Sequence, residues 1–433
     1  MQNTHHRDQH PGEFDEWLQE DHNPYWPRFL GVFLVIAAII GLNVYFLSPA
    51  IQRRVEYAFL RAQAELRNSR PHDMYISTPA LATQSTQLLT VVATPTPTST
   101  PSQAQPAAGA PTATPTATPL PPAVVLQANC QEPQGWNNCG PATLSMALRF
   151  YGWTENQYTV SAATKPNKDD RNVSPGEMVA YTFSLGNMYA ATGYATDIQF
   201  LKFVIANGFP VIVETWFVPE PTDEMGHYRL LTGYDDGAQQ FVTQDSYSGP
   251  HQKVSYGELE PLWKVFNRVY VVVCEAGRAI ELQALLGNTL DQESMYQSAL
   301  AVALAEIAAD PQDRYAWFNA GTNYVGLGLY EEAAAAYDQA RLLKLPWRML
   351  WYQFGPFEAY LHVGRYQDVV NLADANLKTT PNLEESYYYR ALARQALGDQ
   401  AGWQADLRQA LRYNPNFDIA SRLLGELGPD RGP

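Results

Sequence analysis

The stretch that decides the fold of the first domain is Gln-Gly-Trp-Asn-Asn-Cys-Gly-Pro-Ala-Thr-Leu-Ser-Met-Ala-Leu, residues 134–148. Cys139 stands behind a polar turn and before Gly140-Pro141, and apolar residues at helical spacing follow. This pattern predicts a loop that brings Cys139 to the first turn of a buried helix, where free backbone N–H groups and the helix dipole favour a thiolate. A small buried cysteine at the start of a core helix would show the same local pattern, so the rest of the chain must decide.

Length and composition limit the possible classes of protein. The 433 residues are enough for two or three domains, and the net charge of −15 argues against nucleic-acid binding. Three cysteines are too few for a disulfide scaffold or a four-cysteine zinc site. The sequence shows no Gly-rich phosphate loop, so we expect no ATPase module, and we expect neither a metal nor an organic cofactor.

The N-terminal part predicts a membrane anchor. Residues 1–28 form a polar tail, to whose histidines we assign no role, and residues 29–47 form an uncharged apolar run interrupted by Asn43. As a helix this run just spans a bilayer core of about 30 Å. The leader before it is long and acidic, unlike that of a cleaved signal peptide, so we predict a single uncleaved transmembrane helix.

Two further segments connect this run to the folded part. Residues 48–77 are predicted to form a juxtamembrane helix, and residues 78–122, which are rich in Pro and Thr and uncharged, are predicted to form an extended stalk. Because such stalks usually hold domains away from a cell surface, we expect the folded domains on the extracytoplasmic side of a cell membrane. The positive-inside rule argues for the opposite orientation, because several arginines follow the span: Arg53, Arg54, Arg61, Arg67 and Arg70.

Residues 123–276 are predicted to form an α+β domain. Helical patterns come first, and one of them opens at Ser174 with a proline and a Glu177 that completes a capping box. After Pro210 the pattern changes to strands at Val211–Phe217, Tyr228–Tyr234, Gln240–Gln244 and Val269–Val273. Helices followed by antiparallel strands indicate the α+β class.

Residues 280–425 are Ala-rich, helical in pattern and repetitive. Prolines recur at intervals of 35, 35 and 34 residues, at Pro311, Pro346, Pro381 and Pro415. Aromatic and small residues within one period match the tetratricopeptide (TPR) pattern. We therefore predict an all-α TPR solenoid of about four helix hairpins, the first beginning near Ile280. Such an array usually binds a peptide or protein partner, although it could also buttress the preceding domain.

A cysteine nucleophile needs a base and a group that orients the base. A hairpin centred at Asp236 would place His227 directly opposite Asp245 on one face of the sheet, where the carboxylate can fix the imidazole tautomer. A register slip of one residue would separate them. His251, beyond a Gly-Pro pair, is the weaker candidate for the base.

An oxyanion donor is expected in the loop before the nucleophile. The side-chain amide of Gln134 could donate to a developing oxyanion together with the backbone N–H of Cys139, and Gln131 is the alternative.

Four motifs together carry a family resemblance. They are the Cys139 stretch, Asn172-Val173-Ser174-Pro175, Gly226-His227-Tyr228, and Gln244-Asp245-Ser246-Tyr247. They resemble the papain-like cysteine peptidases related to bacteriocin-leader-processing domains, over roughly residues 124–276. The resemblance implies Cys139 as nucleophile, His227 as base, Asp245 as orienting residue and Gln134 as oxyanion donor. The spacing from Gln134 to Cys139 is one residue shorter than is usual there, and no transporter or ATPase module is seen. The double-glycine leader substrate is therefore not carried over.

The sequence thus predicts a membrane-anchored cysteine peptidase whose TPR repeats recruit a protein partner or substrate. One alternative is a catalytically silent, peptidase-like scaffold that acts through its repeats. Another keeps the chemistry but changes the reaction to transpeptidation or amide hydrolysis in the cell wall. The remaining cysteines, Cys130 and Cys274, could form a disulfide between the ends of the first domain or stay as buried thiols.

Overall fold

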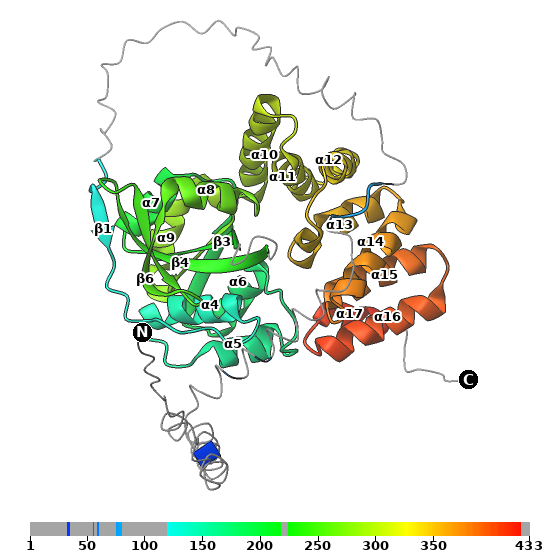
Figure 1. Ribbon diagram of the computed structural model, residues 1–433, viewed down its shortest axis with the longest axis horizontal. Coiled ribbons are helices and arrows are strands. Elements are labelled where there is room, and N and C mark those ends of the chain that lie inside the picture. Colours follow the sequence, from blue (N-terminus) through cyan, green and yellow to red (C-terminus); the bar gives the residue numbers. More distant parts are fainter. Residues whose placement is uncertain are drawn as a thin grey trace, which may run out of the picture. The chain divides into compact units, whose positions relative to one another are not determined.

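The computed structural model describes residues 33–34, 55, 59, 75–79, 119–217 and 224–425 (Figure 1). The chain divides into two compact units, Met1–Ala64 and Glu65–Pro433. Apart from residues 33–34, the predicted transmembrane helix 29–47 lies outside the described residues, as does the tail 1–28. None of the helices that are described is both long enough and apolar enough to cross a bilayer.

The unit Glu65–Pro433 contains an antiparallel sheet. Its strand order is β2-β7-β3-β4-β5-β6, and β1 pairs with the C-terminal end of β4. The strands are β1 (Ala123–Val125), β2 (Met188–Gly193), β3 (Val211–Phe217), β4 (Met225–Asp235), β5 (Gln240–Asp245), β6 (Gly249–Ser255) and β7 (Tyr270–Glu275).

Helices cover both faces of this sheet (Figure 1). Because side chains alternate along a strand, Val271 and Val273 of β7 pack on one face while Tyr270 and Val272 pack on the other. The first face carries α4 (Cys139–Phe150), α5 (Gln157–Thr164) and α6 (Pro175–Ser184), and the second carries α7 (Ile198–Ala206), α8 (Tyr256–Lys264) and α9 (Ala279–Leu286). This arrangement agrees with the predicted α+β class.

The N-terminus of α6 is capped, and the residue before the cap packs against α4, the helix that begins at Cys139. Ser174 Oγ accepts from the Glu177 N–H at 3.2 Å, and Glu177 Oε2 accepts from the Ser174 N–H at 2.7 Å, which completes the predicted capping box. Val173, just before the cap, packs against Gly140: a methyl group at Gly140 would lie 3.2 Å from Cβ of Val173. A side chain at position 140, directly after Cys139, would therefore crowd Val173.

The two remaining cysteines do not form a disulfide. Cys130 and Cys274 are free and buried. Cys130 packs in the cluster on the α4 face of the sheet, whereas Cys274 points from β7 into the cluster on the opposite face. Of the two alternatives, the disulfide is therefore wrong and the pair of buried thiols is confirmed, because the sheet separates the two side chains.

A helical array follows the sheet domain. Its helices are α10 (Gln292–Ala309), α11 (Arg314–Gly326), α12 (Tyr330–Leu342), α13 (Gly355–His362), α14 (Tyr366–Thr379), α15 (Glu384–Ala396), α16 (Gln400–Tyr413) and α17 (Asp418–Gly425), with short 3₁₀ turns at Ala276–Arg278, Gly287–Leu290 and Trp347–Trp351. Gly321 lets paired helices approach, since a methyl group there would lie 2.7 Å from the Tyr337 ring. The predicted first hairpin is absent from these described helices, because Leu282 and Leu286 of α9 pack on the sheet.

The sheet domain and the array share one hydrophobic cluster. Trp216, Phe266 and Val269 of the sheet domain pack with residues of the array such as Phe318 and Tyr337. Polar contacts reinforce the junction: Asn267 Nδ2 donates to Asn323 Oδ1 at 2.7 Å, and the Lys264 ammonium pairs with Asp313 at 2.5 Å. The array therefore does buttress the sheet domain.

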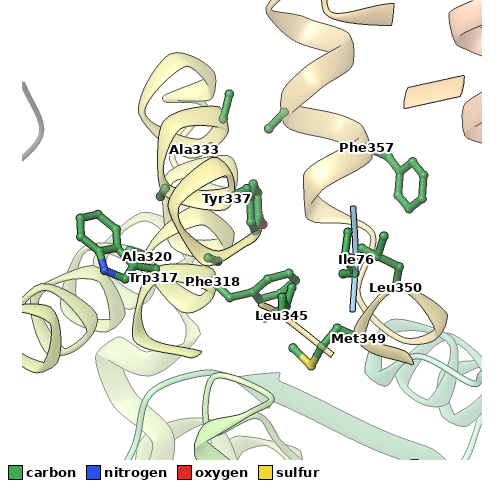
Figure 2. Packing of buried hydrophobic residues seen from close by; sticks show 14 of the residues in the cluster. Ile76, Trp317, Phe318, Ala320, Ala333, Tyr337, Leu345, Met349, Leu350 and Phe357 are labelled. Atoms are coloured by element: carbon green, nitrogen blue, oxygen red, sulfur yellow. The ribbon is translucent and has the colours of Figure 1, made fainter. Parts of the chain in front are cut away.

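Residues 75–79 form an extended segment on the array. Ile76 N donates to Leu345 O at 2.9 Å, and Ser77 O accepts from Arg341 Nε at 2.8 Å. The Ile76 side chain is 8% exposed and lies beside Leu350 (Figure 2). The helix predicted to run to residue 77 was wrong at its end, because burial of Ile76 and the restriction before Pro79 favour extended backbone.

Candidate active site

The hairpin of β4 and β5 brings together residues far apart in the sequence. Near the turn Gly233 opposes Val242, but further along Leu231 opposes Thr243 and Leu230 opposes Gln244, so the register shifts by one at Thr232. The predicted centre of the hairpin at Asp236 was therefore wrong, and His227 does not lie directly opposite Asp245.

The bulge at Thr232 decides which face Asp245 shares. With Gln244 opposite Leu230, the same register continued by one residue brings Asp245 to Arg229, and Asp245 Oδ2 does accept from Arg229 Nε. Arg229 shares its face of β4 with His227, two residues away. Without the extra residue, Asp245 would lie level with Leu230 and face away from His227. His227 and Asp245 therefore do meet, as the sequence predicted, but through a different strand register from the predicted one.

The His227 imidazole is held by the Asp245 carboxylate. His227 Nε2 lies 3.1 Å from Asp245 Oδ1, and both side chains are buried. The same Oδ1 accepts from the N–H groups of Tyr247 and Ser248, and Oδ2 accepts from Arg229 Nε at 3.1 Å. Burial alone would raise the pKa of Asp245, but these partners lower it well below its ordinary range, so the group is a carboxylate.

Arg229 is a site residue that the sequence reasoning missed. Its guanidinium donates to Thr215 Oγ1 as well as to Asp245, and it lies over the Phe217 ring, whose centroid is 4.8 Å from that of His227. The period of two along a strand could have identified it, because Arg229 follows His227 by two residues and shares its face.

Cys139 begins α4 and lies beside the His227 imidazole, near enough for each group to shift the pKa of the other. Burial would raise the thiol pKa, but the His227 hydrogen bond and charge, with the Lys165 charge, lower it below its ordinary value. Burial likewise opposes protonation of His227, but Asp245 and Cys139 raise its pKa. Since Asp245 contacts Nε2, Nδ1 is the nitrogen that remains for the thiol, and both pKa shifts act in the direction of a thiolate–imidazolium pair.

A buried polar network shapes the loop before Cys139. Gln157 Oε1 accepts from Gly135 N at 2.7 Å and from Asn138 Nδ2 at 2.9 Å, and Gln157 Nε2 donates to Glu132 Oε1 at 2.9 Å. Lys165 Nζ donates to the carbonyl of Asn137 at 3.0 Å. No local signal pointed to this network, because its partners lie on α5 and beyond.

The two glutamines before the nucleophile are held differently. Gln134 Oε1 accepts from Ser246 Oγ at 2.9 Å, so its Nε2 is the end that can donate to a substrate. Gln131 Nε2 already donates to the Asp245 carbonyl at 2.9 Å. His251 Nδ1 lies 3.3 Å from Gln244 Nε2 at the hairpin of β5 and β6. The geometry therefore favours Gln134 over Gln131, and His227 over His251.

The fold and site define a domain of papain-like type followed by helical repeats. Residues 123–271, about a third of the chain, match the model of the Peptidase_C39 like family. The chain therefore carries a Peptidase_C39-like domain over these residues, and the expected family resemblance is confirmed. A comparison with curated proteins found no match.

Three solved structures are similar to parts of the chain. A C39-like peptidase from Bacillus anthracis is 15% identical over 35% of this chain and 96% of that chain, with a TM-score of 0.28. MamA is 14% identical over 31% and 78%, with a TM-score of 0.28. YrrB, described as a TPR protein with an unusual peptide-binding site, is 15% identical over 34% and 90%, with a TM-score of 0.19.

Proposed function

We propose that the protein is a membrane-anchored cysteine peptidase that hydrolyses peptide bonds. The observation that supports this most directly is the convergence of Cys139, His227 and Asp245 from α4, β4 and β5, with His227 Nε2 3.1 Å from Asp245 Oδ1 and with Cys139 near enough to His227 for each to shift the pKa of the other. A lowered thiol pKa beside a raised imidazole pKa is the arrangement a thiolate nucleophile requires.

The proposed reaction is acyl transfer to the thiol and then to water. The Cys139 thiolate attacks the peptide carbonyl carbon, and Gln134 Nε2 with the Cys139 N–H donates to the oxyanion. The His227 imidazolium gives its proton to the leaving amine as the C–N bond breaks. The neutral imidazole then takes a proton from water, which attacks the thioester and releases the acid and the thiol.

The repeats and the N-terminal run complete the proposal. The array recruits a peptide or protein substrate to the site, and the apolar run 29–47 anchors the chain as a single-pass protein of a cell membrane with its folded domains extracytoplasmic. Protease treatment of sealed, right-side-out vesicles that carry the full chain would test the orientation. Digestion of the folded domains is expected, and their protection would show that they lie on the cytoplasmic side.

The pH dependence of Cys139 alkylation in the full chain tests the chemistry. Cys130 and Cys274 are buried, and burial raises the pKa of each to about 11, so iodoacetamide below pH 8 reports on Cys139. We expect an apparent pKa well below 8.5 that rises in His227→Ala and is unchanged in His251→Ala. An ordinary thiol, indifferent to His227, would favour the silent scaffold instead.

A further inference from the structure

A cavity of about 470 Å³ lies between the sheet domain and the array. Five tyrosines line it, from both the sheet domain and the array: Tyr194, Tyr296, Tyr337, Tyr352 and Tyr389. Two carboxylates, Glu214 of β3 and Glu358 of α13, also line it. Among the described residues, no lysine, arginine or histidine does. The volume lies within the usual range for small-ligand pockets.

Glu214 is a buried carboxyl group without a compensating charge. It is 5% exposed, and the part of the chain that is described shows no ion pair to it or to Glu358. The Tyr228 side chain lies beside it, but the single hydroxyl hydrogen of Tyr228 is donated to Val173 O at 2.9 Å. Burial raises the pKa of Glu214 well above its ordinary range. A cation entering the cavity would favour the ionised form of Glu214 and pair with it.

The cavity adjoins the nucleophile. Tyr352 packs on the residue before His227, since a methyl group at Gly226 would lie 3.1 Å from the Tyr352 ring. The cavity is also lined by Ser174 at the start of α6, next to the Val173 that contacts Gly140. Cys139 is close enough for its charge to raise the pKa of Glu214 and of Tyr352. A substrate side chain in the cavity would therefore belong to a peptide that also reaches the thiol.

We propose that this cavity is a specificity pocket for a positively charged side chain, arginine or lysine, of the peptide substrate. Tyrosine faces attract cations, and the two carboxylates can accept charge-assisted hydrogen bonds from a guanidinium or ammonium group. Four of the five tyrosines and Glu358 belong to the array, so the repeats form one wall of the pocket. This assignment deepens the proposed peptidase function and rests on it.

Three probes of one shape test the charge preference: p-aminobenzamidine, p-aminobenzamide and p-aminobenzoate. Their binding to the full chain is measured by calorimetry or ligand-observed NMR. We expect the amidine to bind at least about tenfold more tightly than the amide, and the benzoate to bind least well. Glu214→Gln and Glu358→Gln, singly and together, should reduce this preference toward unity. Glu331→Gln, which removes a charge from the exposed surface of α12, should leave it unchanged.

Equal binding of the amidine and the amide would contradict the proposed charge preference. So would an unchanged preference in the double variant Glu214→Gln, Glu358→Gln, provided that this variant melts at the same temperature as the parent protein. Protection of Cys139 from a bulky maleimide tests the link to the nucleophile. Saturating amidine should slow the maleimide reaction several-fold, and binding without protection would place the cation away from the substrate path. An ordinary thiol pKa with amidine binding intact would instead remove the peptidase proposal and leave a cation site.

Discussion

His227 and Asp245 share one face of the β4–β5 hairpin only because Thr232 is an extra residue in β4. Arg229 then binds the second oxygen of the same carboxylate, so the group that orients the imidazole is itself held from both sides. The candidate site therefore depends on strand register as much as on residue identity.

Replacement Asp245→Asn tests the orienting role. The amide carries no charge to favour the imidazolium, so the pKa of His227 should fall, the thiol pKa should rise, and alkylation at pH 6.5 should slow by about tenfold or more. NMR titration of His227 would measure the first effect directly. The matched control is Asp236→Asn at the hairpin turn, whose carboxylate pairs with Lys202; the same loss there would remove the special role of Asp245.

The pH profile of turnover should be bell-shaped. The reactive form needs a deprotonated Cys139 and a protonated His227. Because the thiol pKa is lowered from 9.0, activity should be lost only as pH falls below that lowered value, and because the His227 pKa is raised from 6.5, activity should persist until pH passes the raised value. A profile with its acid limb at pH 8–9 would contradict the pair.

Gln134→Ala should reduce turnover by about one hundredfold while leaving the thiol pKa unchanged, since an oxyanion donor acts on the transition state. Gln131→Ala should cost less, because its amide already binds the Asp245 carbonyl. Parallel kcat and alkylation measurements separate the two effects. Equal losses in both variants would show that the loop, rather than one amide, is responsible.

Arg229→Met should destabilise the fold by about 3 kcal/mol, because it leaves the buried Asp245 carboxylate without its Oδ2 partner. Urea unfolding of the full chain measures this loss. In the double variant Arg229→Met, Asp245→Asn, part of the stability should return, since the buried charge is removed as well. Additive losses in the double variant would argue against a direct pair.

The contact between α15 and the loop before α6, where Asn172 donates to Glu385, should weaken as pH rises. Burial raises the pKa of Glu177 to about 7 and that of Glu384 to about 8, and raises that of Glu385 as well. These acids titrate near pH 4 when unfolded, so their stabilising contribution is complete below pH 4 and is lost as pH rises toward 8. The melting temperature should therefore fall over that interval.

The matched variants Glu384→Gln and Glu385→Gln keep an oxygen for Asn414 and Asn172, which donate to these side chains in the parent. Both should flatten the pH dependence and raise stability at pH 8 by about 1 kcal/mol or more. The exposed Glu331→Gln serves as the control. If the double variant Glu384→Gln, Glu385→Gln kept the same dependence of melting temperature on pH, other groups would be responsible for that dependence.

Local signals predicted the elements better than they predicted the site. Cys139 at a helix start, the capping box at Ser174 and the strand that carries His227 follow from patterns within a few residues. The bulge at Thr232 has no such signal, because it depends on packing between two strands. The Glu132–Gln157 contact and the tyrosines around the cavity join residues distant in the chain, which periodicity cannot pair.

Both ends of the Pro/Thr-rich stretch are held by the same folded body. At one end Ile76 is fixed on the array, and at the other the carbonyls of Pro121 and Pro122 accept from Tyr234 and from the N–H of Asp236. Residues 75–79 and 119–122 are therefore joined through the contacts of the folded body as well as through the chain between them. A single proteolytic cut within residues 80–118 should therefore leave the segment around Ile76 bound to the array, so that both fragments elute together under native conditions.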